Sequence, residues 1–352
     1  MEYVFLIIYF EERMNPLAEN ANQYQPPKIT VLMPVYNVSK FLPKCLQTLM
    51  DQTFRDFRLI AVNDGSTDNC LEILRDFEAK YHNITVIDQP NRGMSMARNA
   101  ALALADSKYI CFVDSDDYLA PTFLQELYQA ITSNDADIAC CYYYYHFVES
   151  DSLYKYPFRT SGVFNKEEAL KKLLKDVQIQ SLAWNKIYKR SLFVDHGITF
   201  PSMAFEDMAT THRLFSHAEK VVVINRALYY YNQQSASTLA TINAQKINDF
   251  ILATAMVRAS LDQNGVYDKY KKAYRSLTKK TGWYCLYCAL KIHRKNKSMG
   301  GLWSNMKKIR SALSFCASKE FDHATYSYDL PGVLSPQEFD KKPRITKPKR
   351  ES

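Results

Sequence analysis

The sequence lacks a hydrophobic run long enough to cross a membrane. Near the N-terminus the apolar run YVFLIIYF covers only residues 3–10, whereas a spanning helix needs about 20 apolar residues. This run also has no basic segment before it and no small-residue cleavage site after it, so it makes a poor signal peptide. A translation start at Met14 would leave the run outside the native protein.

Two glycine-rich phosphate-binding patterns are also missing. No G-x-G-x-x-G follows the first expected strand, which disfavours an ordinary dinucleotide-binding fold, and the absence of G-x-x-x-x-G-K-[ST] excludes a P-loop. The C-x-x-C formed by Cys285 and Cys288 has no second ligand pair at the spacing of a zinc site, so helix packing is its expected role. Five other cysteines fall in apolar stretches, and we expect them to be reduced core thiols of a cytosolic protein: Cys45, Cys70, Cys111, Cys140 and Cys141.

Positive charge is concentrated in the C-terminal third of the chain. Lysine and arginine number 45 against 37 aspartates and glutamates, and basic residues dominate from Lys269 to Arg310 and again from Lys341 to Arg350. Such a concentration indicates an anionic partner, for example a membrane surface, or else a solvated helix face. No nucleic-acid-binding motif accompanies the charge, so we expect no nucleic-acid partner.

Strands and helices alternate along the first part of the chain. Apolar β-prone runs are separated by segments with apolar residues at helical spacing, which predicts an α/β domain with a largely parallel sheet. The four expected strands are ITVLMPVY (29–36), FRLIAV (57–62), ITVID (84–88) and YICFV (109–113). Ligands bind beyond the carboxyl ends of such strands, and polar residues collect there.

The remainder of the chain is less regular. We expect helices at 124–133 and 166–175 and a strand at 136–147, whose four tyrosines either pack at a sheet edge or stack on a sugar or base. From Asp249 to about Ser314 the pattern is mostly helical, with a break at Gly300 and Gly301.

The fourth expected strand ends in three carboxylates, Asp114, Asp116 and Asp117. Like charges this close repel each other, so a positive partner belongs there. A calcium loop is excluded because Tyr118 and Leu119 stand where it needs Asn or Asp and then Gly. Two chemistries remain: a haloacid-dehalogenase-type phosphatase with Asp114 as nucleophile, and a D-x-D site that holds Mn²⁺ or Mg²⁺ against a nucleotide diphosphate.

Three segments in fixed order resemble the family 2 glycosyltransferases of GT-A fold. They are VLMPVYNVSKFLPKCLQTLMDQTFRDFRLIAVNDGSTDN, RGMSMARNAAL and YICFVDSDDYLAP. The later WNKIYKRSLF and FEDMATTHRLF are similar to the bacterial surface-polysaccharide and lipooligosaccharide branch of that family. The resemblance covers roughly residues 28–237. It implies a GT-A nucleotide-diphospho-sugar transferase fold, with a mostly parallel central sheet flanked by helices and followed by a helical C-terminal extension.

The resemblance also assigns roles to donor-site residues. Pro34, Tyr36 and Asn37 match a first-strand motif that flanks the nucleoside, and Asp64 matches an aspartate that contacts uracil. The residue before it is Asn63, where the family usually has aspartate. Further matches are Arg98, which helps to hold the nucleotide, Asp116 as metal ligand, and Asp114 facing ribose and metal-bound water. Asp117 is expected to cap the following turn.

On the acceptor side, Glu206 and Asp207 match the family's E-D pair, in which the aspartate is the general base. An aspartate with an ordinary pKa of about 3.9 is ionised near pH 7, as a base must be. The same two residues would also suit a helix N-terminus for electrostatic reasons alone. Trp184, Asn185 and Lys186 are assigned to the donor-sugar or acceptor side, with plain packing as the alternative.

Together these features predict an inverting, metal-dependent glycosyltransferase. It would move a hexose or N-acetylhexosamine from a nucleotide sugar, a UDP-sugar by preference, to a growing surface glycan or lipid-linked oligosaccharide. The expected location is cytoplasmic, peripheral at the inner face of the plasma membrane, on an anionic surface. The alternatives are the phosphatase and a nucleotide-sugar-binding protein that has lost catalysis. The expected parts are a leader (1–27), a catalytic domain (28–240, with a nucleotide-binding half 28–120 and an acceptor half 121–240), a helical region (241–334) and a disordered basic tail (335–352).

Overall fold

A computed structural model describes residues 25–233, 243–295 and 301–321, with only the backbone of Lys295. The expected leader up to residue 24, the alternative start at Met14, the break at Gly300 and the basic tail all lie outside the described residues.

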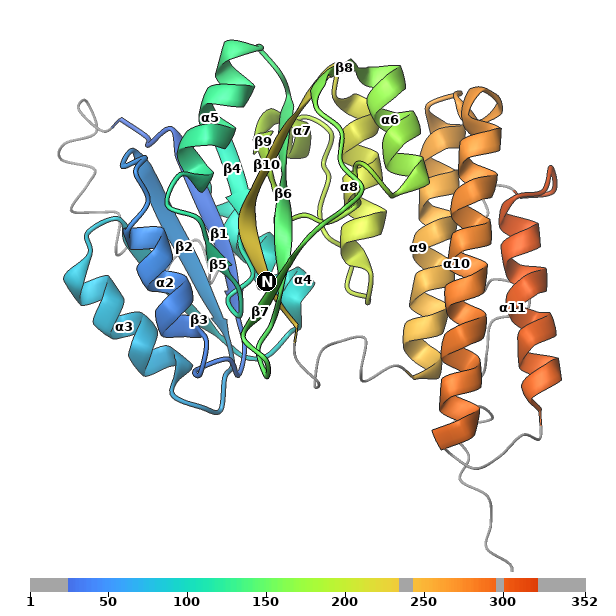
Figure 1. The fold of residues 1–352 in the computed structure, drawn as a ribbon, viewed down its shortest axis with the longest axis horizontal. Coiled ribbons are helices and arrows are strands. Elements are labelled where there is room, and N and C mark those ends of the chain that lie inside the picture. Colours follow the sequence, from blue (N-terminus) through green and yellow to red (C-terminus); the bar gives the residue numbers. More distant parts are fainter. Residues whose placement is uncertain (1–24, 234–242, 296–300, 322–352) are drawn as a thin grey trace, which may run out of the picture.

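The first half of the sheet is parallel, as the alternating pattern predicts. Its strand order is β3-β2-β1-β4, and each neighbouring pair runs parallel. β1 is buried along its whole length, because helices cover both faces of this half (Figure 1). The elements are β1 (Ile29–Val35), α2 (Leu42–Met50), β2 (Phe57–Asp64), α3 (Cys70–Lys80), β3 (Ile84–Gln89), α4 (Met94–Ala103) and β4 (Tyr109–Phe112).

The second half of the sheet is mixed: its longest pair, β6 with β10, is parallel, and the short strands β5, β7, β8 and β9 pair antiparallel, so the expected mostly parallel sheet is correct with antiparallel additions. The order continues β9-β6-β10-β5, with β7 added to β6 and β8 to β10. β9 runs antiparallel to both β4 and β6, and the short turn between β6 and β7 permits only antiparallel pairing. The elements are β5 (Tyr118–Leu119), α5 (Phe123–Ser133), β6 (Ile138–Phe147), β7 (Ser152–Lys155), β8 (Gly162–Asn165), α6 (Lys166–Lys175), β9 (Lys186–Lys189), α7 (Ser191–Val194), α8 (Glu206–His217) and β10 (Lys220–Gln233).

The tyrosine-rich strand β6 lies between β9 and β10, inside the sheet and not at its edge. Tyr142 and Tyr143 are buried, and Tyr144 stacks on Tyr230 with ring centroids 5.3 Å apart. The tyrosines therefore pack against neighbouring strands, as the packing interpretation holds, but inside the sheet, so the expected edge position is wrong.

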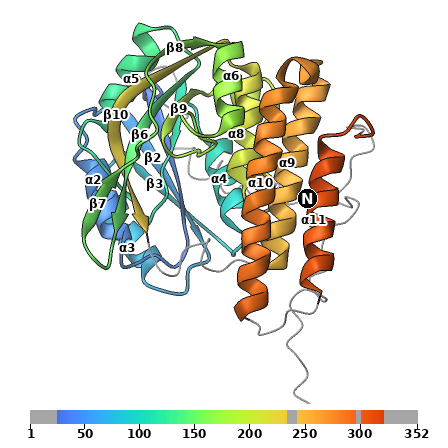
Figure 2. The ribbon, with the colours of Figure 1, turned by 45° about the vertical axis from the view of Figure 1, so that its right-hand side comes forward.

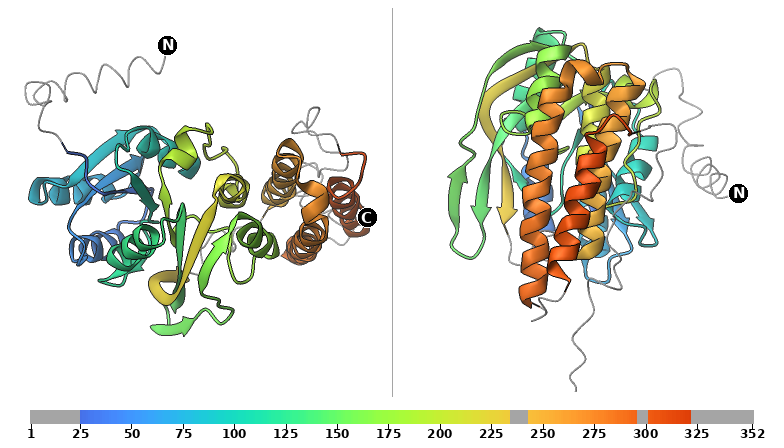
Figure 3. Two further views of the ribbon diagram at one scale, coloured as in Figure 1. Left: turned by 90° about the horizontal axis from the view of Figure 1, so that it is seen from above. Right: turned by 90° about the vertical axis from the view of Figure 1, so that its right-hand side faces the viewer.

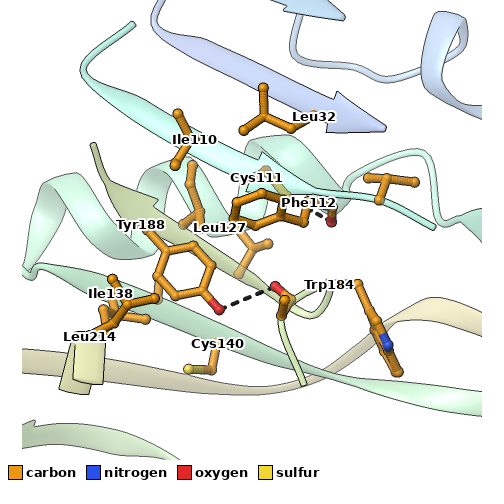
Figure 4. Packing of buried hydrophobic residues seen from close by; sticks show 14 of the residues in the cluster. Leu32, Ile110, Cys111, Phe112, Leu127, Ile138, Cys140, Trp184, Tyr188 and Leu214 are labelled. Atoms are coloured by element: carbon orange, nitrogen blue, oxygen red, sulfur yellow. Dashed lines mark hydrogen bonds between the residues drawn. The ribbon is translucent and has the colours of Figure 1, made fainter. Parts of the chain in front are cut away.

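The main core is aromatic where β4 meets the second half of the sheet. Phe112 is fully buried and contacts the rings of Tyr188, Phe193 and Phe200 at centroid distances of 5.1–6.1 Å. The Tyr188 hydroxyl donates a hydrogen bond of 3.2 Å to the carbonyl of Ala183 (Figure 4). This packing fixes the end of β4, from which the acidic turn leaves the core.

Three helices form a separate layer beside the sheet (Figures 2 and 3). They are α9 (Ala244–Gln263), α10 (Tyr267–Lys295) and α11 (Leu302–Cys316). α9 packs on α8 and α10 packs on α6, while the three helices share a second core that contains Cys285 and Cys288. The thiols therefore serve helix packing, and all eight cysteines are free and buried as expected. Within the described segments, no helix is long and apolar enough to span a bilayer.

Candidate active site

A cleft of about 430 Å³ opens at the carboxyl ends of the parallel strands. This is within the volume range of small-molecule sites, and it lies where α/β sheets bind ligands. The ends of β1, β2, β4 and β10 contribute to it, together with the loop after β3. Its walls are Pro34, Val35, Tyr36, Val38, Asp64, Asn91, Gly93, Met94, Asp114, Ser115, Asp116, Tyr231 and Asn232. Pro34, Tyr36, Asp64, Asp114 and Asp116 are thus where the sequence predicted a ligand site.

The acidic turn after β4 brings three carboxylates close together, and two of them have raised pKa values. Asp114 and Asp116 line the cleft, and Asp117 is buried behind them. Burial and the neighbouring charge of Asp114 raise the pKa of Asp116 to about 6. Burial and the charges of Asp116 and Asp114 raise the pKa of Asp117 well above its usual value.

Asp117 has a different role from the expected turn cap. Its Oδ1 accepts a hydrogen bond of 2.8 Å from the backbone N–H of Asn232, at the end of β10. The amide of Asn232 in turn donates to the carbonyl of Asp116. The turn is therefore fastened to β10, because its carboxylate faces inward where a backbone donor from another strand is within reach.

Arg98 joins the acidic turn to the start of α8. Its Nη2 donates to Asp114 Oδ1, and its Nη1 donates to Glu206 Oε1 and Asp207 Oδ1, all at 2.7 Å. The side chain is almost fully buried and does not line the cleft. Burial alone would lower the pKa of Arg98, but the charges of its three partners raise it, so it stays cationic. The structure thus gives Arg98 carboxylate partners, where the resemblance implied a contact with the nucleotide.

Glu206 and Asp207 begin α8, where the helix dipole favours negative charge. Asp207 Oδ2 also accepts a hydrogen bond of 3.1 Å from the backbone N–H of Ala183. Burial raises the pKa of Asp207 while the charge of Arg98 opposes the rise. Burial and then the charge of Asp207 raise the pKa of Glu206 to about 7. The ordinary carboxyl pKa assumed from sequence therefore does not apply to either group.

Asp64 holds the loop that forms one wall of the cleft. Its two oxygens accept hydrogen bonds of 2.7–3.0 Å from the Gln89 side chain and from the backbone N–H groups of Arg92 and Gly93. The preceding Asn63 donates to Asp88 Oδ1 at 2.6 Å. Asp64 therefore shapes the wall at the same time as it faces the cleft.

Asn37 and the three residues from Trp184 to Lys186 do not line the cleft. Asn37 Oδ1 accepts hydrogen bonds from the backbone and hydroxyl of Thr67, so it ties the end of β1 to the loop after β2. Trp184, Asn185 and Lys186 are buried. Trp184 stacks on Tyr229 at 4.3 Å, and the Tyr229 hydroxyl accepts a hydrogen bond from the backbone N–H of Asp114. The packing alternative describes the placement of these three side chains.

Lys186 has no carboxylate partner in the described structure. Its Nζ donates to the carbonyls of Gln180 and Leu182 and to Asn185 Oδ1, at 2.6–2.8 Å. Burial lowers the pKa of Lys186. This ammonium organises the 180–185 loop, which carries the Ala183 N–H bound to Asp207.

The donor set suits a hard divalent cation. Asp114 and Asp116 present carboxylate oxygens to the cleft, which are the ligands that Mn²⁺ and Mg²⁺ accept. One guanidinium serves three carboxylates, so negative charge remains in excess next to Asp116. Among the described residues no group of three or more His, Cys, Asp or Glu side chains is placed to hold a metal ion by itself.

Sequence reasoning missed several cleft residues. Tyr231 and Asn232 come from the far end of a long strand, Asn91 from a loop and Met94 from the start of α4, with no local pattern that marks them. The Ala183 N–H could not be predicted, because a backbone donor has no sequence signature.

Comparison with known proteins identifies the family. The family model described as glycosyl transferase family 2 matches residues 30–204. The chain is 33% identical over 248 residues to glycosyltransferase GlyG of Streptococcus pneumoniae, across 64% of this chain and 81% of that protein. It is 32% identical over 260 residues to glycosyltransferase GlyA of the same organism, across 71% of this chain but only 37% of GlyA. This chain therefore spans little more than a third of GlyA.

Solved structures confirm the fold. The S. aureus TarS fragment 1–349 in complex with UDP-GlcNAc matches with a TM-score of 0.62 at 20% identity, covering 82% of this chain and 89% of that one. A mannosyltransferase from Pyrobaculum calidifontis in complex with GDP-Man and Mn²⁺ matches with a TM-score of 0.54 at 14% identity, covering 85% and 89%. The expected GT-A fold is therefore correct, with the mixed sheet and the C-terminal helices described above.

Proposed function

This chain belongs to glycosyl transferase family 2, and from that premise we propose that it is an inverting glycosyltransferase. It moves a hexose or N-acetylhexosamine from a nucleotide sugar, preferably UDP-linked, to a growing surface glycan or lipid-linked oligosaccharide. The observation that carries the proposal is the bridge through Arg98, which brings donor-side Asp114 and the E-D pair to one cationic group. The phosphatase alternative is not favoured by the family assignment.

On the donor side, the cleft receives the nucleotide. Tyr36 and Pro34 form the wall beside the nucleoside, and Asp64 faces the base while it fixes the neighbouring loop. Asp116 and Asp114 would hold Mn²⁺ or Mg²⁺, whose charge stabilises the diphosphate as it leaves. Uridine diphosphate as the nucleotide is a proposal drawn from the TarS complex.

On the acceptor side, Asp207 takes the proton of the attacking hydroxyl. Attack on the face opposite the leaving group inverts the anomeric centre. Arg98 and the Ala183 N–H fix the two oxygens of Asp207, and the cation of Arg98 favours the ionised form that a base needs. Glu206 shares the same guanidinium and orients it, so it is a positioning residue.

Substitution of Asp207 by asparagine tests the proposal. Asp207→Asn keeps the shape of the side chain but removes its basicity, so we expect turnover to fall by roughly 100- to 10,000-fold. Binding of UDP measured by calorimetry should remain, because the base does not line the nucleotide cleft.

Asp195→Asn is the matched control, since this aspartate is exposed after α7. Full activity of Asp207→Asn would remove the base assignment. If the wild-type protein binds UDP but releases no UDP from a UDP-sugar with any acceptor, it is a binding protein without catalysis. A covalent aspartyl phosphate on Asp114 would instead indicate a phosphatase.

For the location, we propose the cytoplasm with peripheral attachment to the inner face of the plasma membrane. The support is the basic charge of the C-terminal helices, where α10 has nine lysines and arginines against one aspartate. A lipid-linked acceptor would make such attachment useful, because enzyme and acceptor would then share one surface.

A further inference from the structure

Two helices of the C-terminal layer expose large aromatic side chains. Among the described residues, the three most exposed large apolar side chains are Trp303 (78%), Trp283 (75%) and Tyr287 (62%), on α11 and α10. Burying any of these side chains would be favourable, and their concentration on two adjacent helices indicates an interaction surface.

Basic residues lie on the same faces as the aromatic rings. On α10 an exposed row at four-residue spacing runs through Arg275, Lys279, Trp283, Tyr287 and Lys291. On α11 the exposed row contains Trp303, Lys307 and Arg310. We call these two rows together the basic aromatic face.

The other side of α10 uses its lysines for internal contacts. Lys269 pairs with Glu167 at 2.7 Å and Lys280 pairs with Asp176 at 2.6 Å, both toward α6. By contrast, the five basic residues of the basic aromatic face form no ion pair within the described part of the chain. Their charge is therefore available to an external anion.

A groove of about 360 Å³ runs between the two rows. Gly282 permits the close approach of the helices, since a Cβ there would lie 3.3 Å from Leu313 Cδ1. Leu286, Leu313, Ala317 and the Trp283 ring give the groove an apolar floor. Arg275, Lys279 and Arg310 stand at its rim.

We propose that the basic aromatic face docks on an anionic phospholipid bilayer. Trp283, Trp303 and Tyr287 enter the headgroup region, while Arg275, Lys279 and Arg310 bind headgroup phosphates and the groove takes apolar lipid surface. The views in Figures 2 and 3 place α11 at the outer edge of the molecule, on the side away from the sheet. A soluble polyanion without rings or apolar parts, such as polyphosphate, would account for the charge but not for the exposed tryptophans. The inference deepens the proposed location and does not depend on the transfer chemistry.

Vesicle flotation of the full chain tests this surface. We expect the protein to float with vesicles that contain phosphatidylglycerol, to remain behind with phosphatidylcholine alone, and to be released by salt. Each basic residue near an anionic surface strengthens binding about five-fold. The triple variant Arg275→Gln, Lys279→Gln, Arg310→Gln should therefore bind on the order of 100-fold more weakly. The double variant Trp283→Ser, Trp303→Ser should also lose binding.

Matched controls remove the same number of positive charges and of exposed aromatic rings elsewhere. Lys108, Lys171 and Lys175 are exposed outside this face, as are Tyr154 and Phe158. Changing the three lysines to glutamine, or the two rings to serine, should leave flotation intact.

The proposal is overturned if these controls lose as much binding as the test variants. It is equally overturned if the tryptophan variant floats normally while the face binds soluble polyphosphate. Calorimetry with UDP on the same samples reports the donor site separately, so loss of flotation with UDP binding retained leaves the proposed function standing.

Discussion

At the scale of single residues, one positive charge in the site pairs with three carboxylates. Arg98 is one buried cation for Asp114, Glu206 and Asp207, and each contact is 2.7 Å long. A buried charge left without any partner costs about 3–5 kcal/mol, but Arg98 keeps two carboxylate partners when one of the three is replaced. Burial and then the charge of Asp207 raise the pKa of Glu206, although the contact with the Arg98 guanidinium opposes the rise.

Glu206 gives a pH-dependent prediction. Its pKa is about 7 in the folded chain and about 4.3 when unperturbed, so the folded state binds the proton more tightly. The resulting stabilisation is complete below about pH 4 and is lost as the pH rises through about 7. Glu206→Gln carries no such proton. We expect the free energy of unfolding of this variant to be close to that of the wild type at pH 5. At pH 8 it should exceed the wild-type value by roughly 2–4 kcal/mol.

Thermal denaturation across that pH range checks this expectation. Glu72→Gln is the control, because Glu72 is exposed on α3 and its loss should leave the curve parallel to that of the wild type. Parallel curves for Glu206→Gln and the wild type would contradict the prediction.

At the scale of elements, the loops at the carboxyl edge decide the shape of the cleft. Gly65 follows β2 with a φ of +69°, and a Cβ there would lie 2.6 Å from the backbone nitrogen of Asn91. The close approach lets the loop after β2 pack against the loop that Asp64 holds in place. A side chain at Gly65 would therefore displace one wall of the cleft.

Alanine at Gly65 and at Gly197 separates this displacement from backbone strain. Both glycines have positive φ, but a Cβ at Gly197 meets nothing within 4 Å. Each variant should lose about 1–2 kcal/mol from the left-handed backbone. We expect only Gly65→Ala to weaken UDP binding in addition, by about ten-fold or more. Calorimetry and thermal unfolding measure the two effects, and equal UDP affinity in both variants would disprove the role of the close approach.

Most of the helices and the longer strands were predictable from the sequence. The first four strands and their helices follow from period and composition. The predicted residues of α6 are correct: Asn165 and Glu168 form a capping box at its start, and Asp176 adopts the left-handed conformation at its end. The mixed second half was not readable, because β5, β7, β8 and β9 have two to four residues each and their pairing depends on distant partners. The cleft residues Asp114 and Asp116 were predicted because clustered carboxylates directly follow a buried strand and match the D-x-D motif of the family. Asn232 and the Ala183 N–H were not, since only the three-dimensional fold brings them there.

At the scale of the whole molecule, the C-terminal layer holds the segment that directly precedes Glu206 and Asp207. Asp249 Oδ2, on α9, accepts a hydrogen bond of 3.0 Å from the backbone N–H of Ala204. Phe250 stacks on Phe205 at 4.2 Å, directly before the E-D pair. Phe205 has a φ of +61°, a conformation that a bulky residue keeps only when its surroundings hold it there.

Removal of this support should act on catalysis more than on donor binding. In Asp249→Ala the Ala204 N–H loses its acceptor, and the start of α8 is free to shift. We expect kcat to fall roughly 10- to 100-fold, with UDP affinity close to that of the wild type. Asp268→Ala, which removes an exposed aspartate from α10, should change neither quantity. An equal loss of UDP binding in Asp249→Ala would mean that the layer stabilises the fold generally.

The guanidinium of Arg98 also couples the two ends of the site, because Asp114 and Asp207 both bind it. Any ligand that draws Asp114 toward the cleft changes the field felt by Asp207, because both carboxylates contact the same rigid planar group. By thermodynamic reciprocity, an acceptor that engages Asp207 must then alter the affinity for the donor by the same factor. We therefore expect the two substrates to bind with measurable cooperativity, and substitution of Arg98 to make their binding independent.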